Sequence, residues 1–298
     1  MSYSNVINLL TDRLKLDLLP ELGGRVNKLV FNEFDIFLPF QTQVIKPLQS
    51  YKGGSFSLVP FSNRIKNSRF NFNQLEYKLV KNDPPNAIHG HAYLGKWNVL
   101  KKTDRYVVIV YKHLANQFGW PWSYEVFQTI TLEDNNIFFE LEILNKSNNP
   151  MPFGFGIHPY FNFNDKVKLK FYAEKEWVGS PEEFPIKTKI VENSFDHKKG
   201  SELWKKQKTI CYENFQEEIE IFWVSNRKKV KIKTDKIFKH LIIHVPEHAK
   251  YFCVEPVSHP TDGFNLAYKK IENINCDVLM PDGKIKGVIK VEIDNFSP

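Results

Sequence analysis

Short apolar runs separated by turn residues dominate the hydrophobic pattern of this chain. In segments 124–132 and 136–145, apolar and polar residues alternate, as in a β-strand with one buried and one exposed face. Similar runs, rich in β-branched and aromatic residues, predict strands at 69–80, 105–112, 218–224, 228–234, 240–245, 251–254 and 288–293. The best helical candidate, 201–208, is short. The pattern therefore predicts an all-β fold, a large and mostly antiparallel sandwich or barrel.

Length and composition fit one domain of this class. The chain has 298 residues, of which 42% are hydrophobic and 25% are charged, so it can bury a sizeable core. The sequence contains neither an internal repeat nor a linker long enough to mark a boundary, and all-β sandwiches reach this length as one unit. We expect a single domain over residues 1–298.

The cysteines and the N-terminal segment bear on the compartment. Cys211, Cys253 and Cys276 lie far apart in the sequence and in no paired-ligand spacing, which argues against a disulfide framework and a structural zinc site. Polar residues interrupt the apolar residues of segment 1–20, so it resembles neither a signal peptide nor a membrane span. We expect a cytoplasmic protein, a monomer or a homodimer, with no membrane partner.

A formal net charge of +7 and the basic segment 227–233 raise the question of nucleic-acid binding. Within that segment the lysines alternate with Val230 and Ile232, which is typical of a strand with one solvated face. Basic residues are also spread along the whole chain rather than gathered in one region. We therefore expect no nucleic-acid partner.

Four polar segments combine side chains capable of chemistry with rigid or turn-forming residues: 62–65, 86–91, 154–161 and 253–260. His158 lies in Gly-Phe-Gly-Ile-His-Pro-Tyr-Phe, where the glycines permit close backbone approach and the proline restricts the chain. Glu255 follows an apolar run and precedes a proline, and a carboxylate there is costly unless it is used or paired. Arg64 offers a fork of donors suited to hydroxyl groups, although a surface salt bridge is its common alternative.

These segments, in this order and spacing, resemble the aldose 1-epimerase family, the galactose mutarotases. The similarity covers nearly the whole chain and is carried by Trp97 and by segments 22–25, 60–65, 86–90, 151–161, 254–257 and 278–281. The resemblance implies a large antiparallel β-sandwich of galactose-mutarotase type, a supersandwich. It also implies a small-molecule sugar in an open cleft on one sheet, with no cofactor and no metal.

The resemblance further implies a reaction, the interconversion of the α and β anomers of a free aldose. His158 matches the family's general acid and Glu255 its general base. Anomerisation removes a proton from the C1 hydroxyl while the ring oxygen gains one, and the two groups exchange roles when the ring closes. Arg64 and His89 match residues that hydrogen-bond the sugar, and Asn63 is an auxiliary contact.

One departure from the family concerns substrate choice. Family members carry a substrate-binding aspartate in an Asp-x-x-Phe element, and the best match here is segment 211–215. Counting back from Phe215 places Tyr212 at the aspartate position, with Glu213 one place further on. We therefore assign Tyr212 and Glu213 to the substrate site, and leave open which aldose is accepted and whether it is phosphorylated.

Two other function classes remain open. A sugar-binding protein on the same fold would keep the cleft without turnover. A metal-dependent enzyme of cupin type would use His89, His91, Glu255 and His259 as ligands. The cupin pattern, however, requires a glutamate shortly after the two histidines, and residues 92–96 contain none.

Four residues have two interpretations each. His91 lies two positions beyond His89, so it contacts the sugar if the segment is extended, and otherwise it has a surface role. Trp97, Trp120 and Trp122 offer stacking faces for a sugar, but large aromatic residues in β-proteins mostly belong to the core, which we favour.

Overall fold

The computed structural model describes residues 5–40, 52–179, 184–191, 200–204, 206–248, 250–274 and 276–297. Its main feature is an 18-stranded sheet folded into two layers. The fold is the all-β, antiparallel sandwich that the sequence predicts. Within the described ranges no helix has the length and apolar character needed to cross a membrane.

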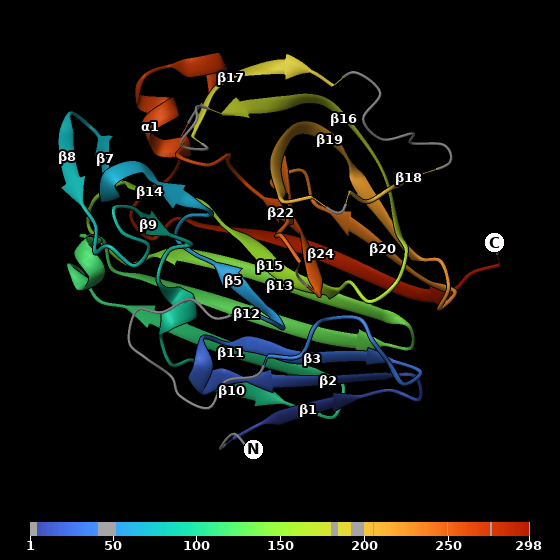
Figure 1. The fold of residues 1–298 in the computed structure, drawn as a ribbon. Helices are drawn as coiled ribbons and strands as arrows, with labels where there is room; N and C mark the ends of the chain where they lie inside the picture. Colours follow the sequence, from blue (N-terminus) through green and yellow to red (C-terminus); the bar gives the residue numbers. More distant parts are fainter. Residues whose placement is uncertain are drawn as a thin grey trace.

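The first layer consists of long strands that pair in antiparallel fashion with their neighbours. β12, β13 and β24 run side by side at its centre (Figure 1). In order across the layer the strands are β10 (Asn98–Lys102), β11 (Tyr106–His113), β12 (Tyr124–Glu133), β13 (Asn136–Asn145), β24 (Lys284–Asn295) and β20 (Lys228–Thr234).

The second layer carries most of the polar segment 154–161 on its strand β15 and the start of the polar segment 253–260 on β22. Its pairings are also antiparallel. In order the strands are β1 (Ile7–Leu10), β2 (Leu14–Leu19), β3 (Arg25–Phe31), β5 (Ser55–Leu58), β15 (Gly156–Asn162), β22 (Tyr251–Val257) and β21 (His240–Val245).

One long strand joins the two layers. The first part of β19 (Lys208–Trp223) pairs with β21 of the second layer, and its last part pairs with β20 of the first. β16 (Val167–Gly179) pairs along both parts, with a shift of register between Phe171 and Ala173. The layers are therefore parts of one hydrogen-bonded sheet.

A single contiguous apolar core fills the space between the layers. Ile130 and Phe139 of the first layer and Leu16 and Phe252 of the second all belong to it. The expected core role of Trp97, Trp120 and Trp122 is confirmed, because all three are buried in this cluster. A smaller cluster lies on the other face of the second layer, around Phe56 and Tyr160.

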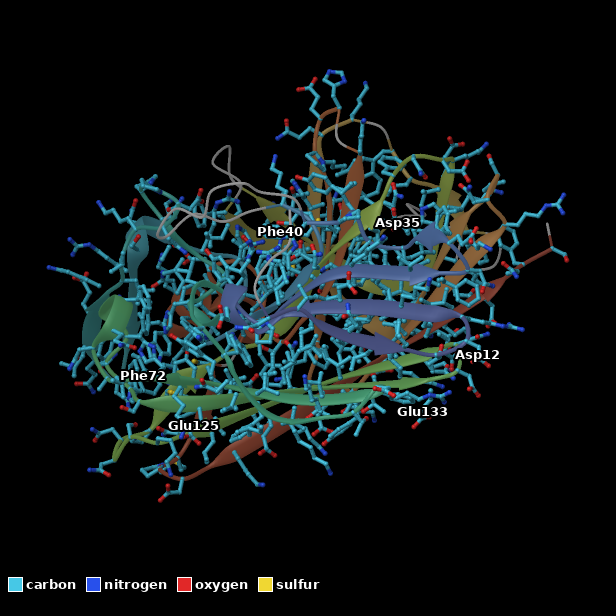
Figure 2. The ribbon with its side chains drawn as sticks, turned by 90° about the horizontal axis from the view of Figure 1, so that it is seen from below. Asp12, Asp35, Phe40, Phe72, Glu125 and Glu133 are labelled. Atoms are coloured by element: carbon cyan, nitrogen blue, oxygen red, sulfur yellow. The ribbon has the colours of Figure 1, made fainter. Side chains whose placement is uncertain are left out.

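The shorter elements cover the ends and edges of the sheet. Figure 2 shows Asp12 and Glu133 near one end of the molecule, where Thr11 Oγ1 donates a hydrogen bond to the Asp134 carbonyl (2.9 Å). The shorter elements are β4 (Phe34–Asp35), β6 (Arg64–Ile65), β7 (Arg69–Phe72), β8 (Leu75–Lys78), β9 (Ala87–Ile88), β14 (Met151–Phe153), β17 (Pro185–Ile190), β18 (Ser201–Glu202), β23 (Asp277–Leu279), α1 (Gly263–Tyr268), and the 3-10 turns Pro20–Leu22, Lys66–Ser68, Ala92–Leu94, Gln117–Gly119 and Ile271–Asn273.

Two predicted elements are wrong. The helix expected at 201–208 is instead the short strand β18 and the start of β19. The single strand expected at 69–80 is a hairpin of β7 and β8, because Asn73 and Gln74 both have positive φ and form a tight two-residue turn.

The basic segment forms β20, as its alternation predicts. Lys229 pairs with Glu220 and Lys231 with Glu218 on the neighbouring β19. The charge of these lysines is therefore balanced within the sheet.

Candidate active site

The register between β15 and β22 brings together the two residues expected to transfer protons. Gly156 pairs with Val257 and Tyr160 with Cys253, so the residues midway between them, His158 and Glu255, face each other. His158 Nε2 lies 3.5 Å from Glu255 Oε1. Glu255 lies inside β22 and is buried, so it does not point into water from a strand end.

Glycines hold this segment close to its neighbours. A Cβ atom on Gly156 would lie 2.6 Å from the Pro256 carbonyl oxygen, and one on Gly154 would lie 2.0 Å from the imidazole of His259. Only a residue without a side chain fits at either position. Gly156 therefore sets the spacing between β15 and β22, and Gly154 lets the chain before β15 approach His259.

Burial controls the protonation of the pair. His158 is 6% exposed and Glu255 is 2% exposed. Burial raises the pKa of Glu255 to about 8. Burial, with the positive charge of Arg25 and the nearby His89 and His244, holds the pKa of His158 well below its usual value. Both shifts favour the uncharged forms, so near neutral pH the shared proton lies on Glu255 and the His158 ring is neutral. Glu255 is therefore the resting proton donor and His158 the acceptor, the reverse of the roles that the resemblance implies.

Each member of the pair also keeps an unused polar atom. His158 Nδ1 and Glu255 Oε2 are buried and have no hydrogen-bond partner among the described residues. Buried polar atoms in native proteins are normally satisfied, and an atom without a partner calls for an explanation such as a bound ligand, ion or water. These atoms are available to a ligand.

Aromatic rings fix the orientation of the His158 imidazole. The ring stacks on Tyr160 (centroids 4.6 Å apart, planes at 14°) and on Phe56 (5.0 Å, 23°). The guanidinium of Arg25 lies over Phe56, 4.5 Å from its centroid, and donates to the Gly53 carbonyl. The imidazole is therefore pre-positioned by packing.

His89 joins the pair from the second polar segment. Its ring meets that of His158 edge-on, with centroids 4.9 Å apart, and its φ is +63°. Burial, with the charge of Arg64, lowers the pKa of His89 to about 3, so the ring is neutral. Its Nδ1 lacks a partner among the described residues.

Arg64 and Asn63 lie beside His89. Arg64 Nε donates to Asp83 Oδ2 (2.6 Å), so the expected alternative of a salt bridge is present, and both side chains are more than one-third exposed. The charge of Arg64 also lowers the pKa values of His89 and His244, so it lies close to these two rings. Asn63 Oδ1 accepts from the backbone N–H of Arg64 (2.7 Å) and so shapes the turn.

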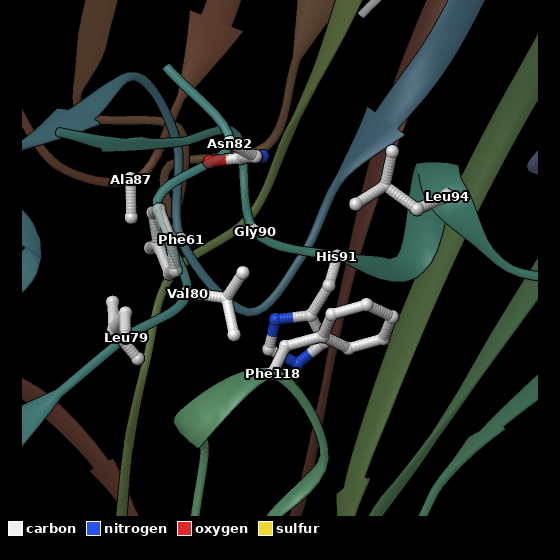
Figure 3. A pocket seen from close by; sticks show the side chains of 9 residues that line it. All are labelled: Phe61, Leu79, Val80, Asn82, Ala87, Gly90, His91, Leu94 and Phe118. Carbon is white, nitrogen blue, oxygen red and sulfur yellow. The ribbon is translucent and has the colours of Figure 1, made fainter. Parts of the chain in front are cut away.

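His91 points away from the pair. Its ring lies 4.3 Å from that of His113 and stacks on Phe118. Figure 3 shows His91 and Phe118 in the pocket that they line with Leu79 and Asn82. The pocket has about 10 Å³ of free volume, about enough for one water molecule and too small for a sugar.

The ligand set of a cupin-type metal site is not assembled. His259 Nε2 accepts from the Ser62 backbone N–H (3.2 Å), which leaves its Nδ1 to donate to the Pro260 carbonyl (2.8 Å). His91 packs against His113 instead. His259 and His91 thus have structural partners. They are not placed as the metal ligands that the cupin-type alternative requires, so that ligand set is wrong.

The side chains of Tyr212 and Glu213 lie on opposite faces of the sheet. Tyr212 is fully buried in the core between the layers, against Phe171, so its expected contact with substrate is wrong. Glu213 pairs with His240, and the neighbouring β21 position Ile242 pairs with Glu255, so alternation places Glu213 on the same face as Glu255.

We call this face the His158 face and define it by His158, Cys253, Glu255, His244, Cys211 and Glu213. Cys253 and His244 were missed from the sequence. Cys253 is two residues before Glu255 in one strand, so the alternation of β22 was a signal that could have found it. His244 gives no such signal, because its neighbour Cys253 lies on a different strand.

Comparison with known proteins supports one family. The sequence model of aldose 1-epimerase matches residues 15–291. The uncharacterized Escherichia coli (strain K12) protein YphB is 31% identical over 125 residues, which are 41% of this chain and 42% of YphB. The chain thus aligns with less than half the length of that relative.

Solved structures share the fold. A galactose mutarotase-like protein from Clostridium acetobutylicum superimposes with a TM-score of 0.84 at 20% identity, over 98% of this chain and 95% of its own. The GalM/aldose epimerase homologue from C. elegans gives 0.84 at 17% identity, over 99% and 100%. At these identities the structures establish the fold, and the sequence match establishes the family. The chain belongs to the aldose 1-epimerase family.

Proposed function

We propose that this protein is a mutarotase that interconverts the α and β anomers of a free aldose by acid–base catalysis. The observation that carries the proposal is the His158–Glu255 pair. An imidazole nitrogen and a carboxylate oxygen lie 3.5 Å apart on a buried face, and each residue has a further polar atom with no partner in the described part of the chain.

The reaction needs one group that removes the C1 hydroxyl proton and one that protonates the ring oxygen. The pair holds one proton, so one member can donate while the other accepts. After the ring opens, rotation about C1–C2 exposes the other carbonyl face, and the groups exchange roles on closure. The sum of the two steps returns the proton to the pair.

The surrounding residues suit a hydroxyl-rich ligand. His89 offers a neutral imidazole next to His158, Arg64 offers an exposed edge of donors, and Glu213 offers a carboxylate across the face. Phe56 and Tyr160 keep the imidazole in place. The proposed chemistry needs only side chains, so activity should persist in EDTA.

The test is mutarotation itself. Freshly dissolved pure anomers of glucose, galactose, xylose, arabinose, fucose and hexose 6-phosphates are followed by polarimetry or NMR with and without protein. The proposal expects acceleration of at least one aldose, and loss of that acceleration in His158→Asn. A protein that binds a sugar without accelerating its mutarotation would instead be the sugar-binding alternative.

A further inference from the structure

Cys253 lies beside the acid–base pair and takes no part in the proposed reaction. His158, Cys253 and Glu255 each offer one metal-ligating atom, and these atoms all lie within 4.8 Å of one another. We propose that the three residues bind a zinc ion at the position of the acid–base pair, so that zinc and sugar exclude each other.

Strand register builds this site. Cys253 and Glu255 alternate onto one face of β22, and β15 places His158 next to them through the pairing of Tyr160 with Cys253. The three donors therefore lie on rigid neighbouring strands, which hold metal ligands more precisely than loops do.

The distance between the His158 and Glu255 donors fits a zinc ion. Zn–N and Zn–O bonds of about 2.0 to 2.1 Å in a tetrahedron hold the two ligand atoms about 3.3 Å apart. His158 Nε2 and Glu255 Oε1 are 3.5 Å apart without any metal. Little movement is needed to complete this edge of the site.

The donor chemistry favours zinc over the common hard cations. Thiolate, imidazole and carboxylate together form a typical zinc set, whereas magnesium and calcium select oxygen ligands. All three side chains are buried, and Glu255 Oε2 and His158 Nδ1 have no partners among the described residues. Three protein ligands leave a fourth zinc position open.

Metal binding would displace the protons of the site. The Cys253 thiol loses its proton to the buffer as the sulfur binds zinc, and the proton held by His158 and Glu255 leaves as their lone pairs become metal ligands. The pair can then neither donate nor accept a proton. This competition rests on the proposed function, but zinc binding itself does not.

The test measures binding without activity. The zinc-free full-length protein is dialysed against Zn²⁺, and the bound metal is counted per chain; Co²⁺ is then substituted, and a thiolate-to-cobalt charge-transfer band is sought. We expect one ion per chain and the thiolate band. Cys253→Ala and His158→Asn should each weaken binding at least tenfold, and Cys253→Ala should abolish the band.

Cys211→Ala is the matched control, because Cys211 is also a buried cysteine on the His158 face. It should keep both the stoichiometry and the band. The proposal is overturned if the folded wild-type protein binds no zinc, or if the band follows Cys211. His158→Asn keeps the test decisive if Cys253→Ala does not fold.

A separate kinetic experiment tests whether zinc and sugar compete. If any aldose is turned over, zinc should raise its KM without changing kcat. Zinc binding in a protein that turns over no aldose would retain the metal site and reject the epimerase proposal, so the two failures are distinguishable.

Discussion

Tyr212 and Glu213 are adjacent in β19, and their side chains lie on opposite faces of the sheet. The Tyr212 ring meets Phe171 edge-on in the core, with centroids 5.0 Å apart. Glu213 lies beside His240 and Lys175, and burial raises its pKa. The carboxylate therefore shares a face with Glu255, and the tyrosine could reach that face only if the strand turned over.

Replacing Glu213 should weaken substrate binding. Glu213→Gln removes one charge-assisted hydrogen bond to a sugar hydroxyl, made equally in the ground and transition states, so KM should rise about tenfold with little change in kcat. Steady-state kinetics on the accepted aldose measure both. Glu218→Gln, an exposed glutamate of the same strand paired with Lys231, should leave KM unchanged. An unaltered KM in Glu213→Gln would remove this residue from the substrate site.

An aspartate at position 212 should damage the fold. Tyr212→Asp places a carboxyl group in the apolar core and leaves a cavity, so the free energy of unfolding should fall by about 3 to 5 kcal/mol. Urea titration measures the loss. Tyr212→Phe, which keeps the ring, should stay much closer to wild type. Lower KM in a stable Tyr212→Asp protein would contradict the placement of this residue.

The rate of mutarotation should depend on both His158 and Glu255. His158→Asn and Glu255→Gln each remove one proton-transfer partner, so kcat should fall by about two to four orders of magnitude. Polarimetry gives the rates, and circular dichroism checks that the fold is retained. His248→Asn, which changes an exposed imidazole, is the control and should keep the wild-type rate. Near-normal rates in either site variant would reject the role assignment.

The spacing of β15 and β22 should matter as much as the side chains. A Cβ at Gly156 would press on the Pro256 carbonyl and on Val257, so Gly156→Ala should push the strands apart and separate His158 from Glu255. We expect kcat to fall at least tenfold, because proton transfer depends steeply on geometry. Gly200→Ala is the control: Gly200 has a φ of +71°, so this alanine is also strained, but it lies against Leu169 and Lys170 of β16 and should leave kcat unchanged.

The buried histidines should make stability depend on pH. Burial lowers the pKa of His113 to about 4, and burial together with nearby His113 holds the pKa of His91 well below its usual value. Tyr111 and Tyr124, which pack against His113, are neutral in this range. The folded state thus holds neutral rings, while the unfolded state takes up protons below about pH 6.5. Stability present above that pH is lost as the pH falls toward 4.

The size of this effect can be measured by urea unfolding between pH 8 and 4. His113 is buried, and by itself it should contribute about 1 to 2 kcal/mol of this loss between pH 7 and pH 5. His113→Phe keeps the stacking on Tyr124 and should lose less stability on acidification than wild type. Equal pH dependence in the two proteins would show that His113 is not a source of it.

The sequence predicts the strands better than it predicts their faces. Alternation located β12 and β13 to within a residue or two, because each has one face in the core. The face of Tyr212 could not be predicted by counting from Phe215. Asn214 has a φ of +53°, and the register with β16 shifts nearby, so the simple two-residue period fails between positions 212 and 219.

The candidate site shows the same limit. His158 and Glu255 stood out by residue type and setting, but their 3.5 Å separation depends on pairing between strands almost a hundred positions apart. From the sequence, Cys253 was considered only by its spacing from the other cysteines. Sequence spacing cannot detect metal-ligating atoms that lie close together on neighbouring strands. His91 and His89 share a short segment, yet the positive φ of His89 sends their rings in different directions.

The bent strand β19 has a mechanical consequence. Because its two parts belong to different layers, this strand links the backbone hydrogen bonds of one layer to those of the other through a continuous chain. A ligand that stiffens Cys211 and Glu213 would therefore slow hydrogen exchange not only in β21 but also in β20, on the far side of the bend. Strand β19 would thus couple the His158 face, where the ligand binds, to the layer that contains β20.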